Sequence, residues 1–222
     1  MKAGVLFSGG KDSVYATYLA KNNDIDISCL ITLNSENKES YMFHTPSILK
    51  VEKQAESMEI PLIIQNTRGE KEKELIDLHK AIKHAINSYQ IDAIITGAIE
   101  SAYQASRVQK ICDKENIDCF NPLWQKNQME LLHDLIEHNF EIIITGVFCY
   151  PLDESWLGKT INKDFIQKVT KLYEKYKINV SGEGGEFESF VLNCPLFKKP
   201  LTVINKTITG QKNSWSMEIE VA

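Results

Sequence analysis

The sequence predicts an α/β fold, in which an N-terminal doubly wound parallel sheet is followed by a smaller C-terminal α+β domain. Strand-like and helix-like segments alternate through the first half of the chain, and a glycine-rich loop, "SGGKDS" at 8–13, directly follows the first apolar run. Near the C-terminus, apolar and polar residues instead alternate with a period of two. Strands that alternate with helices form βαβ units with right-handed crossovers, and period-two alternation indicates half-buried strands.

The first half of the chain provides the elements of the parallel sheet. The strand candidates are short apolar runs bounded by turn residues, at 3–7, 25–33, 61–65 and 92–97. The helix candidates carry apolar residues at helical spacing, at 13–22, after Pro46, at 70–89 and at 103–115. A proline suits the first turn of a helix, where its missing N–H is not needed. This alternation predicts a mainly parallel sheet with helices on its faces.

The second half predicts a different architecture. Its predicted helices lie at 125–139 and 162–177, the second capped by Asn162, and its predicted strands lie at 141–147, 190–197, 201–208 and 214–221. The last two strands alternate with period two around "TGQKNS", so they form a hairpin. We expect a nucleotide-binding domain over 1–121 and a substrate-binding α+β domain over 122–222, and no Pro/Gly/Ser-rich linker marks the boundary.

Composition excludes several classes of protein. The chain has 222 residues and a net charge of −5, from 25 Lys plus Arg against 30 Asp plus Glu, so we expect no extended nucleic-acid surface. The five cysteines contain no CxxC pair, and their odd number without a signal peptide predicts a reduced, cytoplasmic protein. No apolar run approaches the ~20 residues that span a bilayer, so no membrane association is expected. A homo-oligomer is compatible with these numbers.

The loop at 8–13 predicts a phosphate-binding site. Its position between the first strand and the first helix is where ligands bind in open parallel sheets. Its glycines let backbone N–H groups converge on an anion at a helix N-terminus, Lys11 adds a full positive charge, and Asp12 is the expected Mg²⁺ ligand. The alternative is an ordinary turn in which Asp12 or Ser13 merely caps the helix. The predicted nucleotide-binding residues of this loop are Ser8, Gly9, Gly10, Lys11, Asp12 and Ser13.

The loop is not a Walker A motif, because GxxxxGK[ST] is absent. It resembles the PP-loop of the ATP pyrophosphatase superfamily, whose HUP-type, Rossmann-like fold binds ATP for cleavage between the α- and β-phosphates. Further stretches resemble the diphthine–ammonia ligase (diphthamide synthase) family within that superfamily, and together they run to about Lys199. These stretches are "SYMFHT" (40–45), "GAIESAYQASRVQKIC" (97–112), "PLWQKNQMELL" (122–132), "LGKT" (157–160) and "GEGGEFESFVLNCPLFKK" (182–199).

The resemblance implies an ATP-dependent amide ligase. Such an enzyme adenylates the carboxylate of diphthine on elongation factor 2 and amidates it with ammonium, releasing AMP and pyrophosphate. It implies ATP and Mg²⁺ as cofactors, and elongation factor 2 and ammonium as partners. Two alternatives stay open. The chain could be a PP-loop pyrophosphatase acting on another carboxylate or on tRNA, or a non-catalytic ATP/AMP-binding regulatory module.

The resemblance also implies roles for residues outside the PP-loop. Leu33 and Gly97 end predicted strands and His44 follows one, and all three would contact the nucleotide. The predicted substrate-binding residues of the central region are Tyr103, Gln104, Arg107 and Trp124. Tyr103 and Arg107 share one helix face, and Arg107 is also a predicted catalytic residue that would hold a phosphate or the substrate carboxylate. The alternatives are a surface arginine beside a packed tyrosine, and a tryptophan that serves only packing.

The acidic glycine loop at 181–190 is the second candidate site. Its predicted catalytic residues are Glu183 and Glu186, and its predicted substrate-binding residues are Gly184, Gly185, Glu186 and Glu188. We expect these carboxylates to bind ammonium or the trimethylammonium group of diphthine, or to deprotonate ammonium. A second hypothesis has Glu183 or Glu186 helping to hold Mg²⁺. The alternative is a flexible, solvated surface turn.

Overall fold

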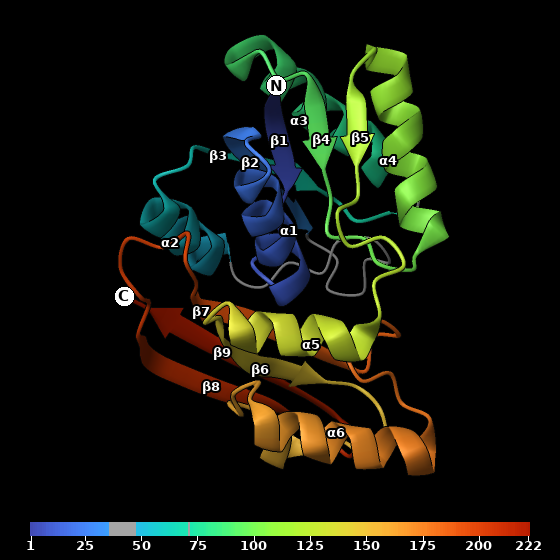
Figure 1. Cartoon of the computed structure of the whole chain (residues 1–222), viewed down its shortest axis with the longest axis vertical. Coiled ribbons are helices and arrows are strands. Elements are labelled where there is room, and N and C mark those ends of the chain that lie inside the picture. Colours follow the sequence, from blue (N-terminus) through green and yellow to red (C-terminus); the bar gives the residue numbers. More distant parts are fainter. Residues whose placement is uncertain (36–47, 71) are drawn as a thin grey trace. The chain divides into compact units, whose positions relative to one another are not determined.

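The computed structural model describes residues 1–35, 48–70 and 72–222, and Figure 1 shows its elements. His44 and Pro46 therefore lie outside the described residues. Two compact units are present, Met1–Trp124 and Gln125–Ala222. The predicted division into nucleotide-binding and substrate-binding domains at residue 121 stays a prediction, because it concerns what each part binds.

The first unit contains a five-stranded sheet of order β3-β2-β1-β4-β5, in which every neighbouring pair is parallel. Its strands are β1 (Lys2–Leu6), β2 (Asp26–Ser35), β3 (Leu62–Thr67), β4 (Ala93–Ile95) and β5 (Asp118–Phe120). The prediction of a doubly wound parallel sheet is confirmed. The order reverses at β1 and β4, and ligands of open α/β sheets bind beyond the carboxyl ends of the strands at such a point.

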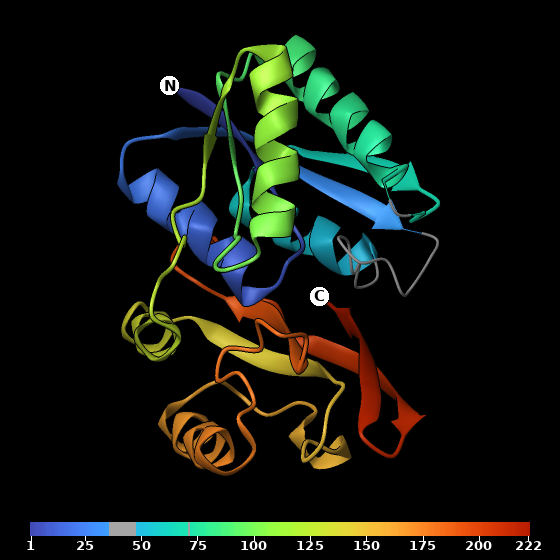
Figure 2. The same ribbon diagram turned by 90° about the vertical axis from the view of Figure 1, so that its right-hand side faces the viewer.

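Helices cover both faces of this sheet. They are α1 (Lys11–Asn22), α2 (Ile48–Met58), α3 (Glu74–Tyr89) and α4 (Ala102–Glu115). Figure 2 shows α3 and α4 side by side against one face. The core beneath them joins Ile31 and Ile94 of the sheet to Leu78 and Ile82 of α3 and Val108 of α4. Burial of this apolar layer fixes both helices, so the loops before them meet the carboxyl edge of the sheet.

Strand β5 is absent from the strands that the sequence predicts. Its three residues, "DCF", include two exposed ones, so no apolar run marks it. It follows Asn116, which ends α4 in the left-handed conformation with φ 55°. The main chain then returns along β4, where Thr96 N–H donates to the Phe120 carbonyl at 3.0 Å.

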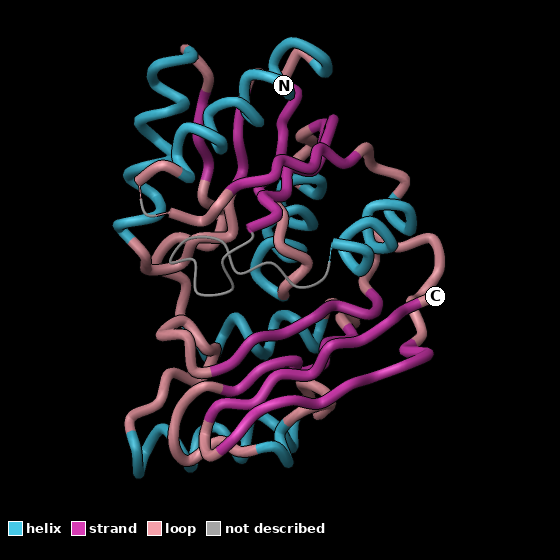
Figure 3. Tube along the Cα trace, turned by 180° about the vertical axis from the view of Figure 1, so that it is seen from behind, coloured by secondary structure: helices cyan, strands magenta, loops and turns pink. Residues whose placement is uncertain are grey.

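The second unit contains a four-stranded antiparallel sheet of order β7-β6-β9-β8, shown from behind in Figure 3. Its elements are α5 (Gln128–Glu137), β6 (Glu141–Val147), the 3₁₀ turn η1 (Glu154–Trp156), α6 (Lys163–Tyr176), β7 (Phe187–Asn193), β8 (Val203–Gln211) and β9 (Ser214–Val221). The predicted hairpin is confirmed as β8–β9. The strand predicted at 190–197 instead ends at Asn193, because Pro195 has no N–H to donate to a ladder.

The core of the second unit lies between this sheet and its helices. The Phe165 ring of α6 meets the Phe187 ring of β7 edge-on, with centroids 5.7 Å apart. The predicted cap of α6 is confirmed, since Asn162 Oδ1 accepts from Phe165 N–H at 2.9 Å. The "LGKT" segment pairs with β6, because Gly158 N–H donates to the Ile144 carbonyl at 2.8 Å.

Candidate active site

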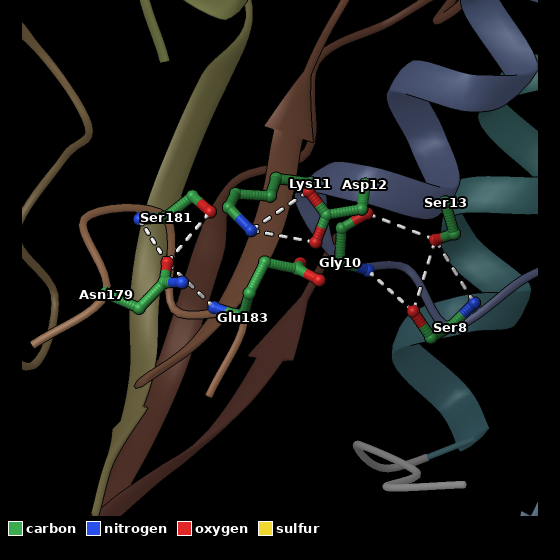
Figure 4. Close-up of polar contacts among 8 residues, drawn as sticks. All are labelled: Ser8, Gly10, Lys11, Asp12, Ser13, Asn179, Ser181 and Glu183. Carbon is green, nitrogen blue, oxygen red and sulfur yellow. Dashed lines mark hydrogen bonds and ion pairs between the residues drawn. The ribbon is translucent and has the colours of Figure 1, made fainter. Parts of the chain in front are cut away.

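The PP-loop lies between β1 and α1, beside β4 at the point where the strand order reverses. Ser13 Oγ accepts from Ser8 N–H at 3.2 Å and donates to the Gly10 carbonyl at 3.1 Å, as Figure 4 shows. The N-cap of α1 is Gly10, and no side chain caps the first turn. The Ser13 side chain therefore holds the loop together and does not cap the first turn of α1. This arrangement leaves the first turn to bind an anion.

Lys11 is a charged side chain that the fold buries, since only 4% of its surface is exposed. Its Nζ donates to Asp12 Oδ1 at 2.9 Å and to Oδ2 at 2.7 Å (Figure 4). A buried ammonium needs such a partner, because desolvation of a lone charge is costly. The Lys11–Asp12 pair is neutral as a whole, and it places an ammonium and a carboxylate together at the start of α1.

A metal ion would find one carboxylate in this loop, that of Asp12. Among the residues that the structure describes, no group of three or more His, Cys, Asp or Glu side chains is arranged to hold a metal. Mg²⁺ ordinarily binds through one or two carboxylates, together with substrate phosphates and waters. The donor set therefore fits a metal that arrives with a nucleotide and does not form a complete protein cage.

Gly97 packs against the PP-loop. A Cβ atom at this position would lie 2.8 Å from both the Asp12 carbonyl carbon and the Ser13 nitrogen. Thr96, immediately before it, bonds through Oγ1 to Asn121 Oδ1 at 2.5 Å and accepts from Ala98 N–H at 3.1 Å. The loop after β4 is thus pinned to the residue that follows β5 and abuts the loop after β1.

The helix face predicted for substrate binding carries a stacked ion pair. The Arg107 guanidinium carbon lies 3.3 Å from the centroid of the Tyr103 ring. Arg107 Nε and Nη2 donate to one oxygen of Glu72 at 3.2 and 2.5 Å, and the Tyr103 hydroxyl donates to the same oxygen at 3.1 Å. The structure thus brings Tyr103 and Arg107 together as predicted from their spacing. It adds Glu72, whose carboxylate engages both.

The other predicted residues of the first unit have varied surroundings. Leu33 belongs to the core under α3, so a contact with a nucleotide would come from its main chain. Gln104 N–H donates to Ser101 Oγ at the start of α4. Trp124, 39% exposed, ends a turn in which its N–H donates to the Asn121 carbonyl. The predicted roles of these residues, like that of His44, stay predictions.

The acidic loop of the second unit is organised by Asn179. Asn179 Oδ1 accepts from Ser181 N–H at 3.0 Å, from Ser181 Oγ at 3.2 Å and from Glu183 N–H at 3.2 Å, as drawn in Figure 4. Gly185 N–H donates to the Gly182 carbonyl at 3.0 Å, which closes a further turn. These bonds give the loop a defined path in the structure.

Glu186 lies inside this loop. Its Oε1 accepts from Asn179 N–H at 2.8 Å, while its Oε2 is buried and has no hydrogen-bond partner among the described residues. The carboxylate folds over Gly184, where a Cβ would lie 2.7 Å from Oε1. Burial, and then the negative charge of Glu186, raise the pKa of the Cys149 thiol. The site is therefore electronegative and has one unused acceptor.

Glu188 is on β7, opposite Gly146 of β6. A Cβ at Gly146 would lie 3.2 Å from Glu188 Oε2, so this carboxylate extends over β6. Phe148, two residues along, is 38% exposed, and its N–H donates to the Glu186 carbonyl at 2.9 Å. The two carboxylates thus have different surroundings, one enclosed by its own loop and one lying over the sheet.

Sequence reasoning missed two residues of these sites, Glu72 and Asn179. Asn179 left a signal, since an asparagine ahead of a glycine-rich stretch commonly accepts from main-chain N–H groups that follow it. Glu72 left none, because its bond to Arg107 spans 35 positions of the chain.

Comparison with known proteins places both units in one family. The model of the diphthamide synthase N-terminal domain matches residues 1–118, and that of its C-terminal domain matches residues 126–221. Diphthine–ammonia ligase of Rattus norvegicus is 35% identical over 222 residues, which cover 91% of this chain and 83% of that protein. The Homo sapiens protein of the same name is 34% identical, with the same coverage.

A solved structure, described as a predicted subunit of tRNA methyltransferase from Methanocaldococcus jannaschii, covers 88% of this chain and 98% of that chain. Its sequence identity is 19% and its TM-score is 0.46, so the assignment rests on the sequence relatives. In the described part of the chain, no helix has the length and apolar character needed to cross a bilayer.

Proposed function

The chain belongs to the diphthamide synthase family, and we propose that it is an ATP-dependent ligase that amidates diphthine on elongation factor 2 with ammonium. The observation that carries the proposal is the PP-loop, with an uncapped helix N-terminus beside the buried Lys11–Asp12 pair. The diphthine carboxylate would attack the α-phosphorus of ATP, pyrophosphate would leave, and ammonia would then displace AMP from the acyl-adenylate.

The PP-loop would hold the β- and γ-phosphates. The N–H groups of the first turn of α1, which no side chain caps, suit phosphate oxygens, and Lys11 would stabilise the charge that develops on the leaving pyrophosphate. Binding requires the Lys11 ammonium to exchange part of its contact with Asp12 for a phosphate oxygen. Asp12 would then be available to bind Mg²⁺, with phosphate oxygens and waters completing its shell. When bound, the ion neutralises charge on the pyrophosphate.

Arg107 would hold the carboxylate to be activated, or an oxygen of the α-phosphate. Its planar guanidinium suits either anion, and stacking on Tyr103 fixes its orientation. The Glu72 carboxylate bound to Arg107 in the structure supports this role, because a substrate carboxylate would offer the guanidinium the same kind of oxygen acceptor. A substrate carboxylate would compete with Glu72 for Arg107.

Glu186 would bind ammonium and accept the proton that ammonium must lose before ammonia attacks the acyl-adenylate. A buried carboxylate oxygen without a partner is unfavourable, and a cation with N–H groups relieves it. The trimethylammonium group of diphthine has no N–H, so Glu186 Oε2 suits ammonium better. Glu188, which lies over β6 near the exposed ring of Phe148, would suit the trimethylammonium group, because aromatic faces also attract quaternary ammonium. Glu183 would contribute negative charge to this loop.

The test is incubation with diphthine-bearing elongation factor 2, ATP and ammonium, followed by mass spectrometry of the modified residue. The proposal predicts replacement of one hydroxyl by an amino group, with AMP and pyrophosphate as co-products. Pyrophosphate release without a change in elongation factor 2 would indicate another substrate. Binding of ATP without its consumption would indicate a regulatory module.

A further inference from the structure

A groove separates α3 from α4 on the outer face of the first unit. Its volume is about 290 Å³. Leu75 and Ile76 of α3 and Ile111 of α4 give it an apolar floor, while Arg107, Lys110 and Lys114 of α4 line one wall. Ile76 is 60% exposed, so apolar surface faces solvent in this groove. The groove begins at the Arg107–Tyr103 stack, so it is continuous with the predicted substrate residues.

The charges along this groove are not balanced. Lys110 and Lys114 are both exposed, and neither has an acidic group within ion-pairing distance in the part of the chain that the structure describes. Two other residues that line the groove do have acidic partners. Arg107 is paired with Glu72, and His79 of α3 is bonded to Glu115. The middle of the wall therefore carries two uncompensated cations beside exposed apolar surface.

This combination favours an acidic segment of a protein over a nucleic acid. The apolar floor would bury aliphatic side chains, which supply most of the favourable energy of protein interfaces. A nucleic-acid backbone would gain nothing from that floor. Dense clusters of Lys and Arg are the usual mark of phosphate-backbone binding.

The spacing of the lysines limits the ligand further. Lys110 and Lys114 are four residues apart on α4, which corresponds to a rise of about 6 Å along the helix. An extended peptide advances about 3.3 Å per residue, so carboxylates two residues apart would face the two lysines. The residue between the two carboxylates and the residues on either side of the pair would point to the other side of the strand, so apolar residues at those positions would reach the floor.

We propose that the α3–α4 groove docks an acidic, partly apolar segment of the protein substrate and leads it to Arg107. The inference rests on the proposed function for the identity of that protein. It assigns Lys110 and Lys114 to substrate docking, and they take no part in the chemistry.

The test compares the double variant Lys110→Glu/Lys114→Glu with a matched control, Lys171→Glu/Lys175→Glu. The control lysines are exposed and four residues apart on α6, so they change the net charge equally. Binding to intact diphthine-bearing elongation factor 2 is measured by interferometry without ammonium, and amidation kinetics are measured separately. We expect the first variant to weaken binding and to raise KM roughly tenfold, with kcat retained at saturation, because rim charges act mainly on association. The control should match the wild type, and raised salt should shrink the difference.

The two proposals fail separately. Amidation with unchanged binding and KM in Lys110→Glu/Lys114→Glu would overturn the docking inference and leave the function intact. Binding that depends on these lysines, without amidation by the wild type, would overturn the proposed function alone. Displacement of elongation factor 2 by a single-stranded RNA, but not by a peptide containing Asp-Leu-Asp, would also overturn protein docking.

Discussion

A Cβ atom on Gly97 would lie 2.8 Å from the carbonyl carbon of Asp12. Real side chains essentially never approach a backbone carbon so closely, and the obstacle cannot rotate away as a side chain would. Gly97 therefore allows the loop after β4 to abut the PP-loop, and the two neighbouring loops form one rigid edge of the sheet. The notion that a nucleotide passes close to Gly97 stays a prediction, while the contact with Asp12 gives the glycine a structural reason of its own.

Replacing Gly97 by alanine should displace the PP-loop. We expect Gly97→Ala to raise KM for ATP by about tenfold or more and to lower the free energy of unfolding by about 1–3 kcal/mol, as overpacking does. Titration with ATP and urea denaturation measure the two effects. Ala102→Ser, which adds an atom at an exposed position of α4, is the control. Wild-type ATP binding by Gly97→Ala would show that the loop does not depend on this packing.

Removing the charge of Lys11 should abolish chemistry. Lys11→Met is expected to lower the rate of pyrophosphate release by about 100-fold or more, the usual cost of losing one group that stabilises developing charge. Lys21→Met, at the exposed end of the same helix, should leave the rate unchanged. Equal rates for both variants would contradict a role for Lys11.

Substitutions of Glu186 and Glu188 should affect the two cationic substrates separately, one changing KM for ammonium and the other KM for elongation factor 2. Glu186→Gln keeps an acceptor for Asn179 N–H but loses the charge beside it, so KM for ammonium should rise with KM for elongation factor 2 unchanged. Glu188→Gln should have the opposite pattern. Each variant serves as the control for the other. If both variants shift the same KM, the proposed division between ammonium and trimethylammonium is wrong.

Asn179 should stabilise the acidic loop through its acceptor oxygen. Asn179→Ala removes an acceptor from three donors and should cost about 1–3 kcal/mol of unfolding free energy, measured by urea denaturation. Asn179→Asp retains an oxygen at the same position and should cost less. An equal loss for both variants would show that the oxygen does not organise the loop.

Glu72 should compete with the substrate for Arg107. Glu72→Gln removes the charge that pairs with the guanidinium, so KM for the protein substrate should fall severalfold, whereas Arg107→Lys should raise it because a lysine cannot form the forked contact. Steady-state amidation kinetics measure both changes. A rise in KM for Glu72→Gln would mean that Glu72 positions Arg107 and does not compete with the substrate.

The parallel sheet was predictable because its buried strands are apolar runs and its helices have apolar stripes. Strand β5 was not, since "DCF" at 118–120 is an exposed edge whose pairing comes from the path of the chain after Asn116. The end of β7 was also misplaced, because apolar residues continue past Asn193 into a turn at Pro195. Local composition thus predicts where buried strands lie, while edges depend on tertiary pairing.

The candidate sites were predictable where they are contiguous in sequence. The PP-loop and the acidic loop carry their glycines and charged residues within ten positions, so their composition is visible directly. The partners of those residues were not visible. Glu72 meets Arg107 only because α3 and α4 pack together, and Gly97 meets Asp12 only because β1 and β4 are neighbours. Such contacts follow from topology, which local patterns do not specify.

The central claim is that the diphthine carboxylate attacks the α-phosphorus of ATP. Its most direct test uses elongation factor 2 whose diphthine carboxylate is labelled with oxygen-18, with ATP and ammonium, and follows the label by mass spectrometry. An acyl-adenylate route places label from the carboxylate in the phosphate of AMP and leaves pyrophosphate unlabelled. Label in inorganic phosphate or pyrophosphate, or amidation with unlabelled AMP, would contradict the account.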